Sequence, residues 1–342
     1  MSDSTEERAA PPMPWVAAQT RELLTQRGHA WLLQGPSGLG QYHLALAMVR
    51  AWLCENPSEH GACGACASCH AIDVRTHADV CVLMPETVME ALGWPLSEKA
   101  QAEIDSKKRK PSKEIRVEAM RDAVEFSQRT SARGRGKAML VFPAERMNNI
   151  TANTLLKTLE EPPGDVKFVL ASEAAHQLLP TIRSRCLGHN MVWPGLEESL
   201  DWLQAQGIAA APAQTLLRAA GGRPDDALLF AQSGRDPKSW AALPRAMQRG
   251  DVSLVKDWTP MQTIDALHKL CHDLLALKTG AQPRFFDAAD LPKTSAGSPV
   301  AGLTHWARAL TAATRTMEHP FNPGLMLEAI VNQAQQALNS KH

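Results

Sequence analysis

Residues 35–42 read Gly35-Pro36-Ser37-Gly38-Leu39-Gly40-Gln41-Tyr42. The glycines have the spacing of the phosphate-binding loop G-x-x-x-x-G-K-[ST]. An apolar run at 30–33 precedes this stretch and a helical pattern at 43–54 follows it, which is the strand–loop–helix order that such a loop requires. The stretch therefore predicts an α/β domain built around a P-loop-type turn.

Two residues of this loop lack the chemistry of a working one. In a nucleotide-binding loop, backbone N–H groups surround the phosphates, a lysine neutralises their charge and a serine or threonine holds Mg²⁺. Gln41 stands in the place of the lysine and Tyr42 in the place of the hydroxyl residue. Glutamine is neutral, and a phenol is too bulky to serve as the metal ligand. We expect the loop to keep its shape without binding or activating a nucleotide.

A second acidic motif is also missing. Strands are expected at 138–142 and, as the last of the sheet, at 167–171, and their alternation with helices predicts a parallel sheet covered on both faces. An ATPase of this type ends the earlier strand in two acids, but Pro143 and Ala144 occupy those positions here. Glu145 follows one residue late, and a register slip that brings it into use is the alternative.

Four of the seven cysteines are clustered, namely Cys54, Cys63, Cys66 and Cys69. Zn²⁺ prefers four soft ligands in a tetrahedron, and C-x-x-C turns present thiolates to one centre. Because no catalytic partner accompanies them, we predict a closed, structural zinc site. Two alternatives remain open. Cys54 could belong to the core of the preceding helix, with His60, His70 or no residue completing the site, or the thiolates could hold an iron–sulfur cluster.

The composition narrows the class of protein. Basic and acidic residues number 36 each, so net charge alone indicates neither nucleic-acid nor membrane binding. No apolar run approaches the roughly 20 residues of a membrane span, and the polar residues 1–8 do not resemble a signal peptide. We therefore expect a cytoplasmic protein without a membrane partner, in a compartment where cysteines stay reduced.

Several basic residues have the spacing of phosphate contacts. One group lies at 107–110 in a polar stretch, and another is the turn at 133–137 together with Arg129. Such runs are most often solvated turns, and we favour that interpretation for both groups. Arg185 is either a surface ion-pair residue or an arginine finger that reaches the γ-phosphate of a neighbouring subunit. Spacing alone does not choose between these two roles.

Several motifs together resemble the clamp-loader family of AAA+ ATPases, in the form found with bacterial DNA polymerase III. The resemblance rests on their order and spacing, and it is weaker in the C-terminal helices. The motifs are Pro14-Trp15, the altered phosphate loop, the cysteine module after it, Thr154-Leu155-Leu156-Lys157-Thr158-Leu159-Glu160-Glu161-Pro162-Pro163, and Arg183-Ser184-Arg185-Cys186.

The resemblance implies roles for particular residues. Arg185 matches the arginine finger that acts in trans on ATP bound to an adjacent motor subunit. Active members carry a lid arginine where this chain has Asp225, and a negative charge there would repel a triphosphate. Together with the changes at Gln41 and Pro143, three nucleotide contacts are lost. We therefore expect that this subunit neither binds nor hydrolyses ATP.

The same resemblance predicts three structural parts. The first is an α/β AAA+ domain at 1–193, with the zinc module at 54–70. Its polar stretch at 85–113 has no counterpart in the family pattern, and its composition predicts a partly disordered surface insertion. Three short helices form a lid at 194–236. Longer helices form a C-terminal collar domain at 237–342.

The implied function is that of a non-hydrolysing clamp-loader subunit, which supports ATP-dependent loading of a sliding clamp onto primed DNA. Its implied partners are the gamma/tau motor subunits, the delta subunit, the sliding clamp and primer–template DNA. By association the chain would form part of a DNA-directed DNA polymerase, with Zn²⁺ as a structural cofactor. Two other functions remain open, an active AAA+ ATPase with an unusual loop and a zinc-dependent DNA-binding module.

Overall fold

The computed structural model describes residues 13–233, 236–292, 300–316 and 322–339, so the polar start of the chain lies outside it. The chain divides into two compact units, Met1–Glu198 and Ser199–His342, and each is considered by itself. Among the described residues, no helix has the length and apolar character needed to cross a membrane.

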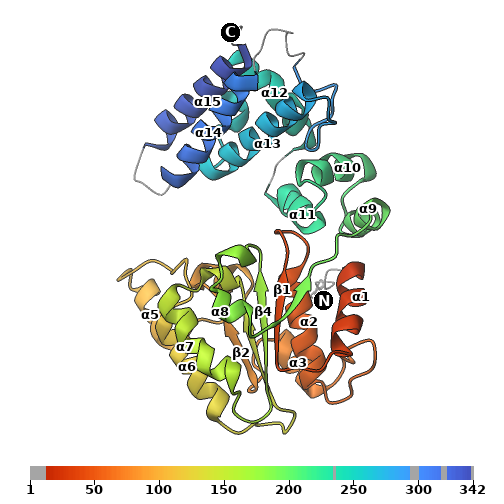
Figure 1. The fold of residues 1–342 in the computed structure, drawn as a ribbon, viewed down its shortest axis with the longest axis vertical. Coiled ribbons are helices and arrows are strands. Elements are labelled where there is room, and N and C mark those ends of the chain that lie inside the picture. Colours follow the sequence, from red (N-terminus) through yellow and green to blue (C-terminus); the bar gives the residue numbers. More distant parts are fainter. Residues whose placement is uncertain (1–12, 234–235, 293–299, 317–321, 340–342) are drawn as a thin grey trace, which may run out of the picture. The chain divides into compact units, whose positions relative to one another are not determined.

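Unit 1 is built on a five-stranded parallel sheet with the order β2-β3-β4-β1-β5 (Figure 1). The strands are β1 (Ala30–Gln34), β2 (Val80–Leu83), β3 (Lys137–Val141), β4 (Val166–Ser172) and β5 (Leu187–Asn190). The chain leaves β1 for the far edge at β2, whereas β4 connects to β5 on the other side. The carboxyl end of β1 therefore lies at a topological switch point, where α/β sheets place their ligand sites.

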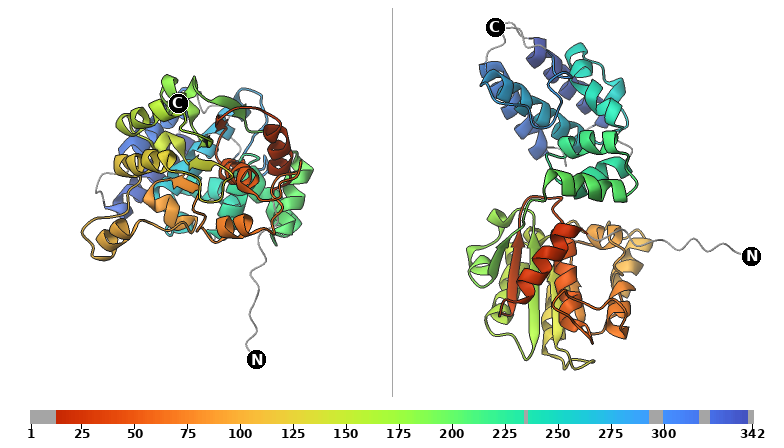
Figure 2. Two further views of the ribbon diagram at one scale, coloured as in Figure 1. Left: turned by 90° about the horizontal axis from the view of Figure 1, so that it is seen from below. Right: turned by 90° about the vertical axis from the view of Figure 1, so that its right-hand side faces the viewer.

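Helices cover both faces of this sheet, as Figures 1 and 2 show. One face is covered by α1 and α2, and the other by α6 and α7, where Leu155 and Phe168 are fully buried. The helices of unit 1 are α1 (Pro14–Leu24), α2 (Gln41–Leu53), α3 (Ala67–Asp73), α4 (Glu86–Ala91), α5 (Glu98–Asp105), α6 (Val117–Gln128), α7 (Asn149–Glu160) and α8 (Pro180–Arg183), with 3₁₀ turns at Ala144–Arg146 and Ala175–Gln177.

The regular secondary structure in the described residues of unit 2 consists of helices. Three short helices come first, followed by four longer ones around a core in which Trp240 stacks on Phe286 with ring centroids 4.7 Å apart. The helices are α9 (Leu196–Ala205), α10 (Ala210–Ala219), α11 (Pro224–Gln232), α12 (Pro237–Arg249), α13 (Pro260–Lys278), α14 (Val300–Thr316) and α15 (Pro323–Asn339), with a 3₁₀ turn at Ser253–Val255. The boundary between the two units falls within α9. The further division into lid and collar stays a prediction.

Three expectations for unit 1 are wrong. The strand at 167–171 is not the last, because β5 pairs with β1 after it. The insertion at 85–113, which we expected to be partly disordered, contains the helices α4 and α5. Lys137 does not lie in a turn but begins β3, where it is 5% exposed and its ammonium group donates to the carbonyl of Phe126.

Candidate functional site

The loop between β1 and α2 has the glycine conformation that its sequence predicts. Gly38 and Gly40 have φ values of 77° and 87°, in the left-handed region that residues with a β-carbon rarely adopt. The indole Nε1 of Trp15 donates to the carbonyl of Leu39 at 2.8 Å, which ties the loop to α1. The loop is therefore held in place by protein contacts.

Gln41 closes this loop on itself. Its side-chain amide nitrogen donates to the carbonyls of Gly35 (2.9 Å) and Pro36 (2.6 Å), and the residue is 2% exposed. The donors of the residue in the lysine position are thus used within the loop. A neutral amide held in this way brings no positive charge to the phosphate position.

Tyr42 fills the position of the metal ligand with a buried aromatic ring. It is 6% exposed, and its ring lies 5.6 Å from that of Phe142 at the end of β3. Its hydroxyl oxygen accepts a hydrogen bond of 2.8 Å from Nε1 of Trp94, which belongs to the insertion. Arg75 lies over the Trp94 ring at 4.5 Å. Burial raises the pKa of Tyr42, so the phenol stays neutral.

The positions after β3 offer no acidic pair. Ala144 is fully buried, and the carboxylate of Glu145 accepts hydrogen bonds from Ser172 Oγ (2.7 Å) and the backbone N–H of Glu173 (3.2 Å). Glu145 is thereby bound to the end of β4. Its hydrogen bonds give it a structural role in the described conformation.

Arg185 follows α8 and forms an ion pair at the surface. Its guanidinium group donates to the carboxylate of Glu160 and to the carbonyl of Thr181 (2.9 Å). The side chain is 30% exposed and that of Glu160 47%. Together with His29 and Ser184 they line an open hollow of about 460 Å³. Asp225, the other residue that we predicted to bear on nucleotide binding, lies in the first turn of α11 in unit 2.

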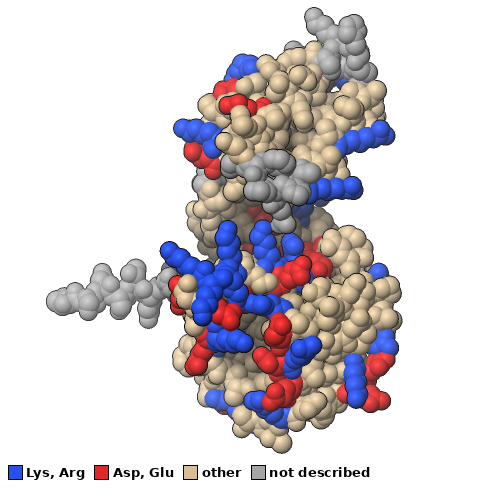
Figure 3. Space-filling model, turned by 90° about the vertical axis from the view of Figure 1, so that its left-hand side faces the viewer, with Lys and Arg blue, Asp and Glu red and all other residues tan. Residues whose placement is uncertain are grey.

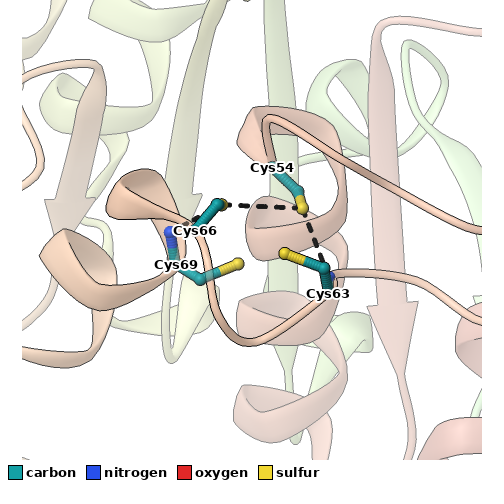
Figure 4. Close-up of side chains that lie close together, drawn as sticks. All are labelled: Cys54, Cys63, Cys66 and Cys69. Atoms are coloured by element: carbon teal, nitrogen blue, oxygen red, sulfur yellow. Dashed lines mark hydrogen bonds between the residues drawn. The ribbon is translucent and has the colours of Figure 1, made fainter.

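The four clustered cysteines come together beside the end of α2 (Figure 4). Cys54 ends this helix in an extended conformation, so its thiol joins the cluster and not the helix core. The four sulfur atoms lie within 4.8 Å of one another, and those of Cys54 and Cys66 are 3.8 Å apart. Zn–S bonds of about 2.3 Å in a tetrahedron place sulfur atoms about 3.8 Å apart. The geometry is therefore compatible with one tetrahedral metal ion.

Backbone N–H groups donate to two of these sulfur atoms. Cys63 N–H donates to Cys54 Sγ (3.2 Å), and Cys69 N–H donates to Cys66 Sγ (3.4 Å). Hydrogen bonds from the backbone of Cys69 and Glu55 lower the pKa of the Cys66 thiol to about 6. Burial raises the pKa of Cys69, so its thiolate would need a nearby positive charge. The Glu55 carboxylate accepts from Ser68 and Arg133, which fastens the module to the turn before β3.

Comparison with known proteins identifies the family. Residues 19–191, just over half of the chain, match the family model described as DNA polymerase III, delta subunit. The chain belongs to this family. This delta-family chain is 39% identical over 216 residues to DNA polymerase III subunit delta' of Pseudomonas aeruginosa, covering 62% of this chain and 58% of that protein. It is 32% identical over 225 residues to subunit delta' of Escherichia coli, covering 64% and 60%.

A relative with a different subunit name is also similar. The delta-family chain is 32% identical over 206 residues to DNA polymerase III subunit tau of Escherichia coli, covering 58% of this chain and 28% of that protein. The chain thus spans about three fifths of the length of the two delta' relatives and a smaller part of tau. These matches confirm the resemblance that the motifs indicated.

One residue of the site in this delta-family chain escaped the sequence-based predictions. Trp94 lies in a polar segment that we expected to be partly disordered, yet it is 8% exposed and bonded to Tyr42. An isolated tryptophan in a polar segment was the available signal, because so large an apolar ring is rarely left in water. The partner of that ring could not be read from the sequence.

Proposed function

We propose that this chain is a non-hydrolysing subunit of a clamp loader and binds no ATP at its own phosphate loop. The observation that supports this best is the closure of the loop by Gln41, whose amide donates to Gly35 and Pro36. A nucleotide would have to break these hydrogen bonds, and it would meet no positive charge at position 41, because glutamine is neutral. The buried ring of Tyr42 stands where a hydroxyl group would hold Mg²⁺.

Arg185 then serves the ATP site of a neighbouring subunit. Its pair with Glu160 is partly exposed, and exposed ion pairs are worth only about 0–1 kcal/mol. The guanidinium group can therefore exchange that carboxylate for a γ-phosphate at little cost. ATP binding by the neighbour would close the subunit interface around Arg185, and hydrolysis would release it.

The partners follow from the family and the similarity to tau. We propose that gamma/tau subunits supply the ATP sites, and that a delta subunit, the sliding clamp and primer–template DNA meet this chain in the assembled complex. In this arrangement residues 194–236 act as the lid, and 237–342 act as the collar domain that holds the ring of subunits. The buried apolar core of unit 2 supports this proposal, because it packs the helices of a collar domain against one another.

We also propose that the four cysteines hold a structural Zn²⁺. All four protein ligands come from one short segment, and the thiols with their N–H···S bonds match the ligand set that zinc prefers. With four thiolates bound, the ion keeps no open position for substrate. Its chemistry would be limited to fixing the turns between α2 and α3.

The test is the DNA- and clamp-stimulated ATPase rate of the complex reconstituted with its gamma/tau and delta subunits. We expect Arg185→Ala to lower hydrolysis at the adjacent site by at least ~10-fold, since arginine fingers contribute large factors to phosphoryl transfer. Arg183→Ala, which removes an exposed arginine two residues away, is the matched control. Glu160→Gln should leave the rate near that of the wild type, because it removes only the resting partner.

The same experiment separates the alternatives. An unchanged rate with Arg185→Ala would remove the finger assignment and leave a structural role in the ring. ATP turnover by the isolated chain would instead show an active ATPase with an unusual loop.

A further inference from the structure

The insertion at 85–113 carries a lysine-rich turn after α5, and one arginine anchors this turn. Arg109 donates to the carboxylates of Glu86 (2.8 Å) and Glu103 (2.7 Å). The side chain of Glu86 is 9% exposed, and its carboxylate also accepts from the N–H of Ser112 at 2.7 Å. The charge of Arg109 is therefore neutralised within the insertion, and the turn is held in one place.

The lysines on either side of Arg109 have a different environment. Lys107, Lys108 and Lys110 are exposed, and none forms an ion pair or a side-chain hydrogen bond with another part of the described chain. Three ammonium groups are thus presented to solvent on an anchored turn of four residues.

Lys107 occupies a backbone position that favours glycine. Its φ is 56°, and its N–H donates to Ile104 (2.8 Å) while the next N–H, of Lys108, donates to Glu103 (3.0 Å). These are the two bonds of a Schellman motif, in which a residue with a β-carbon is strained. Strain kept at a surface position is a reason to look for a function of the side chain. No hydrogen bond or ion pair of the Lys107 side chain with the described chain accounts for it.

The surrounding surface is also basic. Figure 3 shows the side of the chain on which α5 lies in Figure 1. Lys and Arg side chains gather in the upper part of that face of unit 1, and Asp and Glu side chains lie among and below them. The chain as a whole is neutral, with 36 basic and 36 acidic residues. The positive charge is therefore local, in the turn at 107–110 and in the upper part of this face.

We propose that Lys107, Lys108 and Lys110 form a contact site for the phosphate backbone of nucleic acid. Ammonium groups on flexible stems make point-charge contacts with successive phosphates. Residues 95–116 contain no aromatic side chain for base stacking, so the contact is independent of base sequence. The choice of nucleic acid over an acidic protein rests on the proposed function, in which this subunit works beside DNA.

The test measures binding of the isolated full-length chain to a fluorescent 30-base-pair duplex by anisotropy, between 50 and 200 mM NaCl. Lys107→Gln/Lys108→Gln/Lys110→Gln should weaken binding at least ~10-fold at 50 mM and reduce the slope of log K against log [salt] by about 0.9 per lysine. The matched control is Lys238→Gln/Lys256→Gln/Arg308→Gln, which removes three exposed charges from unit 2 and should bind like the wild type.

Two further measurements distinguish a phosphate contact site from a generally basic surface. Lys107→Gly relieves the strained position, so it should raise the midpoint of thermal unfolding while lowering the salt slope by about 0.9. Polyglutamate of equal charge should compete poorly. Equal DNA binding by both triple variants, no DNA binding by the wild type at 50 mM, or tighter binding of polyglutamate would each overturn the proposal. None of these outcomes bears on the Arg185 test, which reads ATPase activity in the complex.

Discussion

The phosphate loop and the cysteine module lie close together in the sequence, and both are glycine-containing turns that frame a ligand site. They differ in where their polar atoms find partners. In the loop, Gln41 donates to loop carbonyls and Tyr42 accepts from Trp94. In the module, four thiols converge on one centre, and backbone N–H groups donate to the sulfur atoms of Cys54 and Cys66. The loop is completed by the chain itself, whereas the geometry of the module is compatible with a bound metal ion.

This difference shows that the spacing of a motif is a weaker guide to ligand binding than whether its polar groups already have partners in the protein. The glycine spacing at 35–40 keeps the backbone path of a nucleotide site. Gln41 and Tyr42 replace the lysine and the hydroxyl residue of the motif, and their buried side chains fill the loop. Trp94, about 50 residues away, donates a hydrogen bond to Tyr42. The cysteine motif extends over 54–69, and the four thiols that it contributes lie within 4.8 Å of one another.

The largest expected effect is the loss of the metal. Cys69→Ser replaces a fully buried thiol with a poor zinc ligand, and we expect zinc content to fall from about one ion per chain. The free energy of unfolding should fall by at least ~3 kcal/mol, because metal binding at a structural site is coupled to folding. Metal analysis by plasma mass spectrometry together with urea unfolding would measure both quantities.

Cys186→Ser is the control for that substitution, since Cys186 is another free thiol of unit 1 that lies outside the cluster. It should retain the metal. If the purified chain held no metal and Cys69→Ser were no less stable than Cys186→Ser, the module would be a cluster of packed thiols. Iron in place of zinc would turn the site into an iron–sulfur centre.

A smaller loss of stability is expected when the hydrogen bond between Tyr42 and Trp94 is removed. Tyr42→Phe leaves the buried Nε1 of Trp94 without its acceptor, which should lower the free energy of unfolding by about 2 kcal/mol. Combining it with Trp94→Phe should cost about 1 kcal/mol less than the sum of the two single changes. Urea unfolding of the four proteins gives this coupling. Strict additivity would show that the insertion does not complete the loop.

The sequence predicted those parts of unit 1 that rest on local patterns. The apolar runs of β1, β3 and β4 and the helix after the phosphate loop are found where the pattern places them. β5 was missed because Leu187-Gly188-His189-Asn190 has no apolar periodicity, and its strand conformation comes from pairing with β1. The same holds for the candidate site. The cysteine spacing is local and was predicted, whereas the contact between Tyr42 and Trp94 arises only in the folded chain.

The helices of the insertion were missed for a related reason, which gives the last prediction. Their polar sequence suggested disorder, but Glu86 joins the start of α4 to Arg109 and Ser112 beyond α5. Burial alone would raise the pKa of Glu86, and the hydrogen bonds from Arg109 and Ser112 outweigh it, so its pKa lies below the ordinary 4.5. Glu86→Gln should therefore cost about 1.5 kcal/mol at pH 7.

That cost should depend on pH with a defined sign. A carboxylate whose pKa is lower in the folded state contributes its stability above pH 4.5, and the contribution is lost as the pH falls through the folded-state pKa. The difference between wild type and Glu86→Gln should thus shrink on acidification, as followed by urea unfolding from pH 7 to 3. Glu90→Gln, which removes an exposed carboxylate from the same helix, is the matched control. If the difference stayed constant across this range, the charge of Glu86 would not be what stabilises its contacts with Arg109 and Ser112.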